Sequence, residues 1–541
     1  MKTMNSLDLS ILGVYLLIVF WIGLKWSKEA GKSTDHFFVA NRGLPWWILG
    51  ISMAATNYSI DTPLAITKLV VTQGVAGVWF WWAGALSALL VAFLFSRLWR
   101  RAGVVTDAEI VELRYGGRSA AALRLFKGLY FGVFFNVFIM AWVFLALHKV
   151  IAAITDLPTL PLLIIGTLLS FIYTIASGIY GVILTDLFQY GLAALGAILI
   201  AYFSVGHVGG LEALWLKLDS APEGLTSFTA FSDEGALLPS SVFLTYLCVK
   251  WWAHKWADGG GKHIQRMLSA RDERHAMWAT LFFAVNATLV VWPWILTALC
   301  SYVALGVQSD PEMAYPMMMT TALPHGVLGL SVACLAGAFM STIDTHLNLG
   351  ASYVINDLYR RFWRREESEA HYVLMARVTM GLMLALSVVI SMNMESVASS
   401  WKFLITFAGG AGVTWILRWF WWRINAWTEL SAMLASGLIA TYLKLAHPEL
   451  LLSTTLLSCV FGSALIWLPV TLLSAPVSDE RLGEFVRRVR PGAAGWGRVY
   501  RQESLEHEPY LGGALLRWVL AVALLFGFNF LVGGALLGRF S

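Results

Sequence analysis

The chain has 541 residues, of which 58% are hydrophobic and 13% charged, a composition that excludes a water-soluble globular protein. Its net charge of +5 does not point to nucleic acid, because the Lys and Arg residues lie mainly in alternate loops between apolar segments. Its four cysteines fall inside apolar runs, and their spacing supports neither a disulfide framework nor a zinc site.

The apolar runs are near 20 residues long, which is the length that an α-helix needs to cross about 30 Å of hydrocarbon. The first run, 11–26, carries basic residues at and beyond its far end, so we expect a retained span and not a cleaved signal. Hydropathy predicts about fourteen transmembrane helices in all. They lie near residues 8–26, 45–71, 77–97, 122–149, 159–178, 181–205, 239–258, 277–304, 324–355, 374–393, 399–418, 427–445, 453–473 and 514–536.

Positive charge alternates between loops as the positive-inside rule requires. If both termini face outward, the inner loops hold most of the basic residues: Lys25, Lys28, Lys32 and Arg42; Arg97, Arg100, Arg101, Arg114 and Arg118; Lys262, Arg266, Arg271 and Arg274; Arg360, Arg361, Arg364 and Arg365; and those from Arg481 to Arg501. The sequence therefore predicts an all-α polytopic membrane protein.

The loops between the predicted spans are short. The longest, near 207–240 outside and 474–517 inside, are too small for a soluble catalytic or kinase domain. No nucleophile or metal motif supports an intramembrane enzyme, so we expect no catalytic activity. The charged inner segment 478–508 is expected to be a solvated loop, with docking of a partner as the alternative.

Two predicted spans are irregular. The second carries polar residues and a proline at mid-depth, where polar side chains can satisfy a broken helix; these are Asn57, Ser59, Asp61, Thr62 and Pro63. The seventh ends in the segment 250–261, which combines charges with three consecutive glycines and is a poor helix interior. Interrupted spans five helices apart are typical of inverted-repeat transporters, which place them around a midplane site.

One motif carries a family resemblance. Residues 341–348, Ser-Thr-Ile-Asp-Thr-His-Leu-Asn, followed by Asp357 and Tyr359, resemble the eighth core helix of the sodium:solute symporter family, which includes sodium/glucose cotransporters, proline permease and bacterial sialic acid carriers. Segments 52–59, 185–189 and 265–271 resemble the family's first and fifth core helices and the inner loop after its sixth. The resemblance covers residues 8–425, and the motifs follow the family's order.

This resemblance implies a LeuT-type fold, a 5+5 inverted repeat. Residues 1–44 would hold a leading transmembrane helix and an inner loop, 45–205 the first five-helix repeat, 206–238 an outer loop and 239–425 the second repeat. Residues 426–541 would add three transmembrane helices with an inner loop at 474–513.

The resemblance also implies a sodium site between the first and eighth core helices. Its ligands would be the backbone carbonyls of Ala55, Tyr58 and Ala338 and the hydroxyls of Ser341 and Thr342. Sodium is a hard cation that takes oxygen ligands, and an unwound helix supplies carbonyls that a regular helix keeps for itself.

Some relatives hold a second sodium between the fifth and eighth core helices. The matching residues are Asp186, Ser341, Asp344 and Thr345, and Asp344 stands where those relatives have a hydroxyl residue. Two neighbouring carboxylates in hydrocarbon can equally share a proton, because like charges at close range disfavour double ionisation. The sequence leaves sodium and a proton as alternatives at this pair.

The solute pocket is expected beside the two breaks, where three residues of the second span face the segment after the seventh: Asn57, Asp61 and Thr62 opposite Lys250, His254, Lys255, Trp256 and Asp258. The family's sugar carriers have polar residues at the first three positions and an aromatic gate near Trp256. The segment 250–258 differs strongly from the family's sugar carriers and matches no transporter of known substrate, so the resemblance does not name the solute.

The residue types of this pocket allow several ligands. Tryptophan faces stack on sugar rings or organic cations, Asp61 can accept hydroxyls or an ammonium, and the lysines can hold a carboxylate. Alternatively, Lys255 and Asp258 form an inner mouth that contacts only water, and His254 is a hydrogen-bonded lining residue.

The sequence thus predicts a secondary active transporter in the cell inner membrane, multi-pass, that couples a small polar organic solute, favouring a sugar or sugar derivative, to the sodium ion. Its partners would be the small-molecule solute and the lipid bilayer, with no nucleic acid and no obligate protein partner. The alternatives are a solute-binding membrane sensor without transport and a proton-coupled symporter for an organic acid or amino acid.

Overall fold

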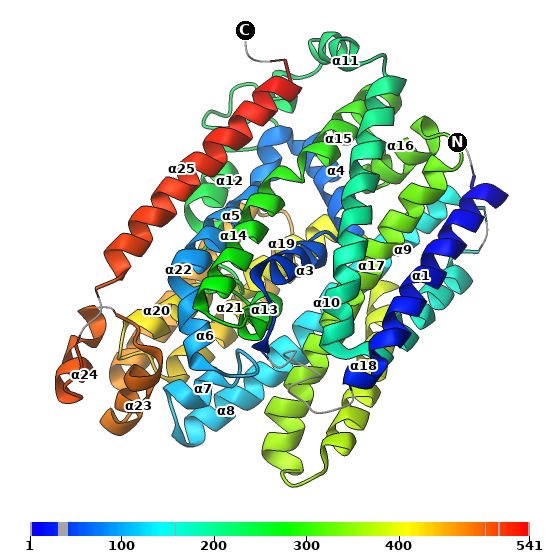
Figure 1. Cartoon of the computed structure of the whole chain (residues 1–541). Helices are drawn as coiled ribbons and strands as arrows, with labels where there is room; N and C mark the ends of the chain where they lie inside the picture. The colour runs from blue at the N-terminus through cyan, green and yellow to red at the C-terminus, as the bar shows by residue number, and fades with distance from the viewer. Residues whose placement is uncertain (1–2, 31–41, 157, 493, 507–508, 539–541) are drawn as a thin grey trace.

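The computed structural model describes residues 3–30, 42–156, 158–492, 494–506 and 509–538. These residues form helices and loops, with one isolated β-bridge between Leu44 and Ala270 and no strand among them. The first described helix begins at the end of the molecule where the last one finishes (Figure 1). Both described chain ends therefore lie on the same side of a membrane.

The helices follow one another in three groups. Before the long outer loop lie α1 (Ser6–Ala30), α3 (Trp46–Asn57), α4 (Asp61–Gln73), η2 (Val75–Val78), α5 (Trp79–Leu90), η3 (Val91–Phe95), α6 (Ser96–Ala102), α7 (Ile110–Arg114), α8 (Gly117–Lys127), η4 (Gly128–Phe135), α9 (Asn136–Ile154) and α10 (Thr159–His207). Next come α11 (Leu211–Leu218), η5 (Glu223–Leu225), α12 (Ser240–Thr245), η6 (Tyr246–Lys250), α13 (Gly261–Ser269), α14 (Glu273–Leu289), α15 (Trp292–Leu305), η7 (Pro311–Met313), α16 (Ala314–Ala322), α17 (Val327–Ser352), η8 (Tyr353–Trp363), α18 (Glu369–Ser391), α19 (Val397–Gly409) and α20 (Gly412–Phe420). The last group is α21 (Ala426–Ala446), α22 (Leu452–Leu473), α23 (Asp479–Val489), η9 (Ala494–Trp496), α24 (Gly497–Gln502) and α25 (Leu511–Leu536).

Eight helical segments of the described chain are long and apolar enough to cross a membrane, or nine if the bent pair α19 and α20, 42° apart, is counted as one span. Other predicted spans lie on shorter or interrupted helices, such as α3 and α4. The multi-pass, all-helical prediction is confirmed. The expected number of about fourteen spans, which came from hydropathy alone, is not.

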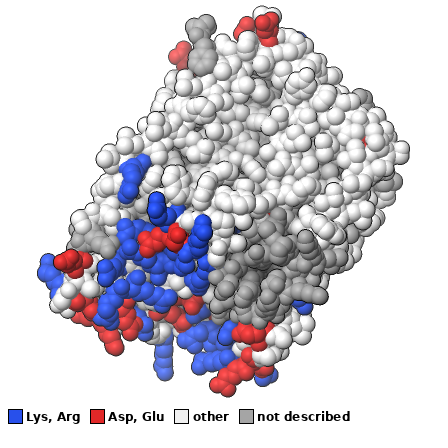
Figure 2. All heavy atoms as spheres, in the orientation of Figure 1, with Lys and Arg blue, Asp and Glu red and all other residues white. Residues whose placement is uncertain are grey.

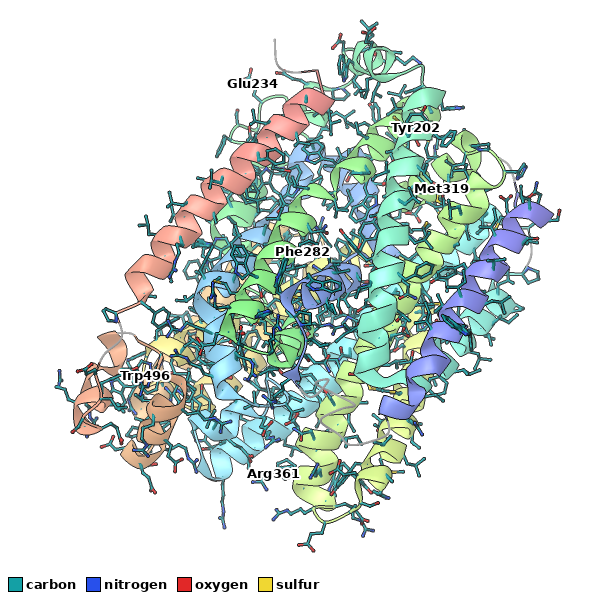
Figure 3. All side chains as sticks on the ribbon, viewed as in Figure 1. Tyr202, Glu234, Phe282, Met319, Arg361 and Trp496 are labelled. Carbon is teal, nitrogen blue, oxygen red and sulfur yellow. The ribbon has the colours of Figure 1, made fainter. Side chains whose placement is uncertain are left out.

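Lys and Arg side chains gather at one end of the molecule, around α6 to α8, α18, α23 and α24 (Figures 1 and 2). Arg361 marks this basic end, whereas Tyr202 and Glu234 lie at the opposite end (Figure 3). The positive-inside rule makes the basic end the inner one. Two predicted inner-loop residues, Lys262 and Arg266, instead belong to α13 and contact the interior; Lys25, Lys28 and Lys32 lie outside the described side chains.

The first predicted break is present. Helix α3 ends at Asn57, Tyr58 has non-helical dihedral angles (φ −89°, ψ 73°), and α4 begins at Asp61. Pro63 lies in the first turn of α4, where its missing N–H costs no helical hydrogen bond. The polar residues that predicted the break thus occupy the junction between two half-helices.

The second predicted break is present as well. The helix formed by α12 and η6 ends at Lys250, and helix resumes only at Gly261. Gly259 and Gly260 have φ angles of +131° and +63°, which side-chain-bearing residues rarely adopt. These glycines turn the chain from the irregular segment 251–260 into α13.

Helix α10 has two limbs that flank α17. On the first limb, Ile165 lines the same cavity as Leu335, and Thr174 donates to Asp344. On the second limb, Asp186 accepts from Ser341, and the Leu192 carbonyl accepts from Cys334. The two limbs therefore run along α17 in opposite directions. This arrangement agrees with the two separate spans predicted for 159–178 and 181–205.

The inner segment 478–508 is folded wherever it is described, so the expectation of a solvated loop is wrong there. Helix α23 buries Leu482, Phe485 and Val486 against the inner ends of α6 and α7. The buried Trp496 donates from its indole nitrogen to the Trp419 carbonyl at 2.7 Å. The charges of the segment face outward from an apolar underside, which hydropathy averaged over the whole segment does not reveal.

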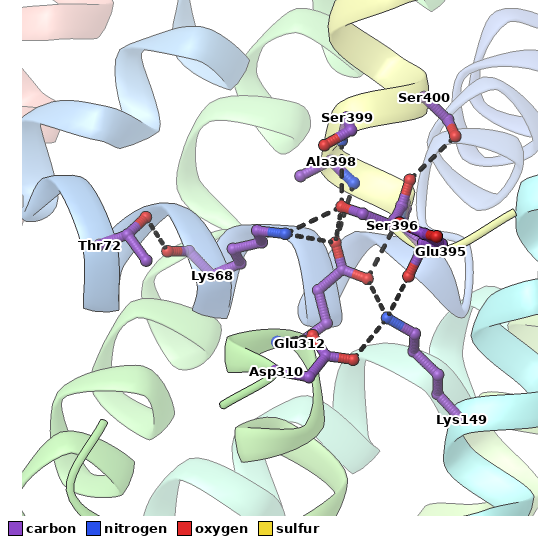
Figure 4. Close-up of polar contacts among 11 residues, drawn as sticks. Lys68, Thr72, Lys149, Asp310, Glu312, Glu395, Ser396, Ala398, Ser399 and Ser400 are labelled. Atoms are coloured by element: carbon purple, nitrogen blue, oxygen red, sulfur yellow. Dashed lines mark hydrogen bonds and ion pairs between the residues drawn. The ribbon is translucent and has the colours of Figure 1, made fainter. Parts of the chain in front are cut away.

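A buried carboxylate joins four elements near the outer end. Glu312 of η7 accepts from the Lys149 ammonium of α9 at 2.6 Å and from the Ser396 hydroxyl at 2.7 Å, and the Lys68 ammonium of α4 lies 3.5 Å away (Figure 4). It also accepts from the backbone N–H groups of Val397 and Ala398, at the first turn of α19. Glu312 therefore ties the outer half of the first broken helix to α9 and α19.

Candidate functional site

The first break lies directly beside α17. Asp186 of α10 connects the two, because one carboxylate oxygen accepts from the Ser52 hydroxyl of α3 and the other from the Ser341 hydroxyl of α17, each at 2.5 Å. The backbone N–H of Tyr58 donates to the carbonyls of Ala54 and Ala55 at 2.9 and 3.1 Å, which closes the last turn of α3. The unwound end of α3 is thereby held against the hydroxyl-bearing face of α17.

The oxygens expected to hold sodium suit a cation. The Ser341 hydroxyl donates its proton to Asp186, and the Thr342 hydroxyl donates to the Ala338 carbonyl at 3.1 Å. Because both protons point to other acceptors, the hydroxyl lone pairs remain available to a positive ion. Ala55, Tyr58 and Ala338 are buried as well, so the carbonyl-and-hydroxyl set is compatible with a sodium site at this junction.

The residues expected for a second cation site are only partly together. Asp186 and Ser341 are in contact, but the Arg266 guanidinium lies 3.6 Å from Asp186 and donates to the Thr345 hydroxyl at 2.8 Å. Asp344 lies on another side of α17 and accepts from the Thr174 hydroxyl. An arginine thus provides the positive charge beside Asp186, and the two carboxylates do not form a hydrogen-bonded pair in the described structure.

The two breaks open onto one cavity of about 180 Å³. All six residues expected for the solute line it: Asn57, Asp61, Thr62, Lys250, His254 and Trp256. Thr342, an expected sodium ligand, lines it too. Ligand pockets for drug-sized molecules run from about 300 Å³ upward, so this volume favours a smaller solute.

Asp61 is fixed at the first turn of α4. One carboxylate oxygen, Oδ2, accepts from the Trp401 indole nitrogen of α19 at 3.0 Å. The other, Oδ1, is buried and has no hydrogen-bond partner in the described structure. Trp401 also stacks on Phe80, with ring centroids 6.1 Å apart and an interplanar angle of 9°. Asp61 is therefore positioned by an aromatic wall, with one oxygen left for a ligand.

The other side of the cavity comes from the second break. Lys250 donates to the Phe80 carbonyl. Both ring nitrogens of His254 contact the backbone of its own loop. Nε2 lies 2.8 Å from the Trp251 carbonyl, and Nδ1 accepts from the Trp256 backbone N–H at 3.0 Å. His254 thus matches the alternative of a hydrogen-bonded lining residue, and its role is to shape the loop that presents Trp256.

Two residues considered for the pocket are elsewhere. The Lys255 ammonium lies 4.3 Å from the centre of the Phe131 ring, within a buried aromatic cluster. Asp258 accepts from Arg418 at 2.6 Å and from the Trp419 indole at 2.9 Å. Both side chains are buried, so the alternative of a water-contacting inner mouth is wrong as well.

The lining residues that were not anticipated include Lys262, His263, His346 and Trp401. Lys262 donates to the Thr56 carbonyl at 2.9 Å, at the unwound end of α3. His346 lies within the recognised 341–348 motif, whose fourth-residue periodicity places it on the same face as Thr342. Trp401 offered no signal, because its link to Asp61 joins positions 340 apart in sequence.

Comparison with known proteins agrees with this geometry. The sequence profile of the sodium:solute symporter family matches residues 37–436. The sodium/glucose cotransporter of Vibrio parahaemolyticus is 23% identical over 518 residues, covering 88% of this chain and 92% of that protein. Sodium/myo-inositol cotransporter 2 of Sus scrofa is 25% identical, covering 83% of this chain and 72% of that one.

A solved structure has the same architecture. The substrate-bound, outward-open Na⁺-coupled sialic acid symporter superposes with a TM-score of 0.72 at 20% identity, over 88% of this chain and 99% of the other. The fold is therefore the LeuT-type inverted repeat. The chain belongs to the sodium:solute symporter family, and it is a multi-pass membrane protein that moves a small solute together with sodium ions.

Proposed function

We propose that this symporter carries a sugar or sugar derivative across the cell inner membrane. The observation that carries the proposal is the single cavity at which both helix breaks meet, with Asn57, Asp61 and Thr62 in its lining and Thr342 beside them. Relatives named as sodium/glucose and sodium/myo-inositol cotransporters support a solute of this class. Transport is the proposed activity, with no catalytic step and no obligate protein partner.

Sodium is proposed to bind at the oxygens of Ala55, Tyr58, Ala338, Ser341 and Thr342. An ion there links the unwound end of α3 to α17, and the solute then contacts Asp61 on the other side of the same break. Each ligand thereby stabilises the arrangement that the other binds, so each raises the other's affinity. Release follows when the proposed repeats, 45–205 and 239–425, rock against one another.

A second sodium remains a proposal at Asp186, Ser341, Asp344 and Thr345. Binding there requires Asp186 and Thr345 to exchange Arg266 for the ion. With one sodium, a membrane potential of about 100 mV supplies roughly 2.3 kcal/mol and a tenfold gradient about 1.4 kcal/mol. Together these support a few hundredfold accumulation of a neutral solute.

Uptake by purified protein in lipid vesicles tests this function. We expect a labelled sugar or sugar derivative to accumulate under an inward sodium gradient and not under an equal potassium gradient. Ser341→Ala and Thr342→Ala should each raise the sodium concentration needed for half-maximal uptake at least severalfold, while Ser399→Ala, an exposed hydroxyl of α19, should not.

Three outcomes would overturn parts of the proposal. Equal uptake in potassium that a proton uncoupler abolishes would make the protein a proton-coupled symporter. Solute binding without any uptake would make it a sensor. Unchanged sodium activation in both variants would remove Ser341 and Thr342 from the ion site.

A further inference from the structure

The cavity carries more positive than negative charge. Its ionisable lining residues are one carboxylate, Asp61, two lysines, Lys250 and Lys262, and the histidines His254, His263 and His346. Each lysine donates to a backbone carbonyl, of Phe80 and Thr56 respectively. Among the described residues, neither lysine has a carboxylate within ion-pair distance.

Several other buried cations pair with carboxylates, although in the described structure Arg114 and Lys255 do not. Lys149 meets Glu312 at 2.6 Å, Arg124 meets Asp357 at 2.7 Å, and Lys127 meets Glu429. Burying an ammonium without a compensating charge is costly, and a carbonyl offsets only part of that cost. An ammonium has three donors, so Lys250 and Lys262 each keep two for a ligand after bonding one carbonyl. Each of the two lysines therefore offers donors to an anionic group inside the cavity.

The acceptors of the cavity are equally specific. The amide nitrogen of Asn136 donates to the carbonyls of Phe131 and Gly132 at 2.8 and 3.2 Å, which fixes the orientation of that amide. Its oxygen lies 2.6 Å from Nδ1 of His346 and must accept, so Nδ1 carries the proton. Nε2 of His346 is then a bare acceptor, buried and without a partner in the described structure.

Asp61 adds a second acceptor of the same kind, since its Oδ1 is buried and unpaired while Oδ2 is held by Trp401. Acceptors without partners bind hydroxyl protons, whereas an ammonium group binds a carboxylate. Phe80 and Trp401 offer ring faces against which the C–H face of a sugar can pack.

We propose that the solute is a sugar acid, a polyhydroxylated ring bearing one carboxylate, and that the carboxylate binds at Lys250 or at Lys262 while Asp61 and His346 accept hydrogen bonds from the hydroxyls. This inference rests on the proposed sugar-class function and narrows it. A neutral sugar leaves both ammonium groups without an ion-pair partner, and an organic cation is repelled by them. The volume of about 180 Å³ limits the solute to a single ring.

The test is thermal unfolding of the purified full-length protein with matched pairs of ligands, in sodium and in potassium. The probes are D-glucuronate against D-glucose and D-galacturonate against D-galactose, with glycine betaine as the cationic comparison. A ligand of the folded state raises the midpoint of unfolding by mass action. We expect a shift with an acid of at least one pair, in sodium only, and none with its neutral partner at the same concentration.

Two substitutions test which residues bind the carboxylate of the solute. Lys250→Met or Lys262→Met should weaken binding of the acid at least tenfold and so identify the lysine that binds the carboxylate, and Lys444→Met, an exposed lysine of α21, should leave it unchanged. Both cavity variants should keep the midpoint shift that sodium alone produces, which shows that they fold and keep the ion site. A variant that loses the sodium shift is replaced by Lys→Gln at the same position.

The outcomes separate this inference from the proposed function. Stabilisation by neutral sugars in sodium, with no effect of the acids, would overturn the sugar-acid assignment and leave sodium-coupled sugar transport intact. Equal stabilisation by an acid in sodium and potassium would support the assignment and count against sodium coupling. If both lysine variants bind the acid as tightly as the parent protein, the proposed role of Lys250 and Lys262 is wrong.

Discussion

We expect replacement of Glu312 to destabilise the protein more than replacement of any other carboxylate at its outer end. Replacing it by Ala removes the acceptor of Lys149 at 2.6 Å, of the Ser396 hydroxyl at 2.7 Å and of two backbone N–H groups at the start of α19. Glu312→Gln keeps the shape and one acceptor oxygen but places an amide without charge beside the Lys149 ammonium.

The size of the expected loss of stability follows from the burial of the Glu312 and Lys149 side chains. The Glu312 side chain is fully buried and that of Lys149 is 8% exposed, so little water can replace the lost partner. Removing one member of a buried pair costs about 3–5 kcal/mol when the remaining charge is left unpaired. Lys149 keeps its contact with the partly exposed Asp310 at 2.7 Å, so the lower end of that range applies. We expect Glu312→Ala to lower the free energy of unfolding by about this amount, and Glu312→Gln by less because it retains hydrogen-bond capacity.

The assay is denaturant and thermal unfolding in detergent, followed by tryptophan fluorescence, with Glu234→Gln as the matched control. Glu234 lies on the exposed outer loop, so its substitution should stay within about 0.5 kcal/mol of the parent protein. Adding Lys149→Met to Glu312→Leu should recover part of the loss, because the buried ammonium is then removed and the charges that remain, Lys68 and Asp310, are partly exposed to water. A Glu312→Ala variant as stable as the Glu234→Gln control would refute the reasoning.

Three further changes test other contacts. Gly260→Ala should weaken solute binding measured by fluorescence titration, because its Cβ would lie 1.9 Å from Cδ1 of Trp256 at a φ of +63°, whereas Gly512→Ala, with open space around it, should bind normally. Asp186→Asn should raise the sodium concentration for half-maximal uptake severalfold. The carboxylate accepts from a hydroxyl of α3 and a hydroxyl of α17, one at each oxygen, whereas an amide has only one acceptor oxygen. An unchanged sodium titration would contradict this. Trp496→Phe should cost at least about 1 kcal/mol in unfolding measurements, because it removes one hydrogen bond and part of a fully buried ring. No loss would show that the inner segment does not depend on these contacts.

Local sequence features predicted the breaks and the candidate ion site. Asn57, Asp61 and Pro63 within one apolar run predict a broken helix by their chemistry alone, and both half-helices are found where expected. Ser341 and Thr342 entered the candidate ion site through the resemblance of the short motif 341–348 to the family's eighth core helix. Such features depend only on residues a few positions apart, so they can be recognised without knowledge of the rest of the chain.

Pocket membership could not be predicted in the same way. Lys255 and Trp256 are neighbours in the irregular segment, yet one enters an aromatic cluster and the other the cavity. In a helix or strand, periodicity predicts which side chains share a face. An irregular segment has no such periodicity, so the direction of its side chains depends on contacts with other helices.

The sequence by itself determined that the chain crosses a membrane many times, where its helices break and which family it belongs to, because span length, proline and glycine chemistry and short motifs are local properties. Only the tertiary structure decided which charges face the solute. Lys262 and Trp401 reach one cavity from distant segments, whereas Asp258 is neutralised by Arg418. In a medium that penalises unpaired charge, the partner of each ionisable group depends on how the helices pack.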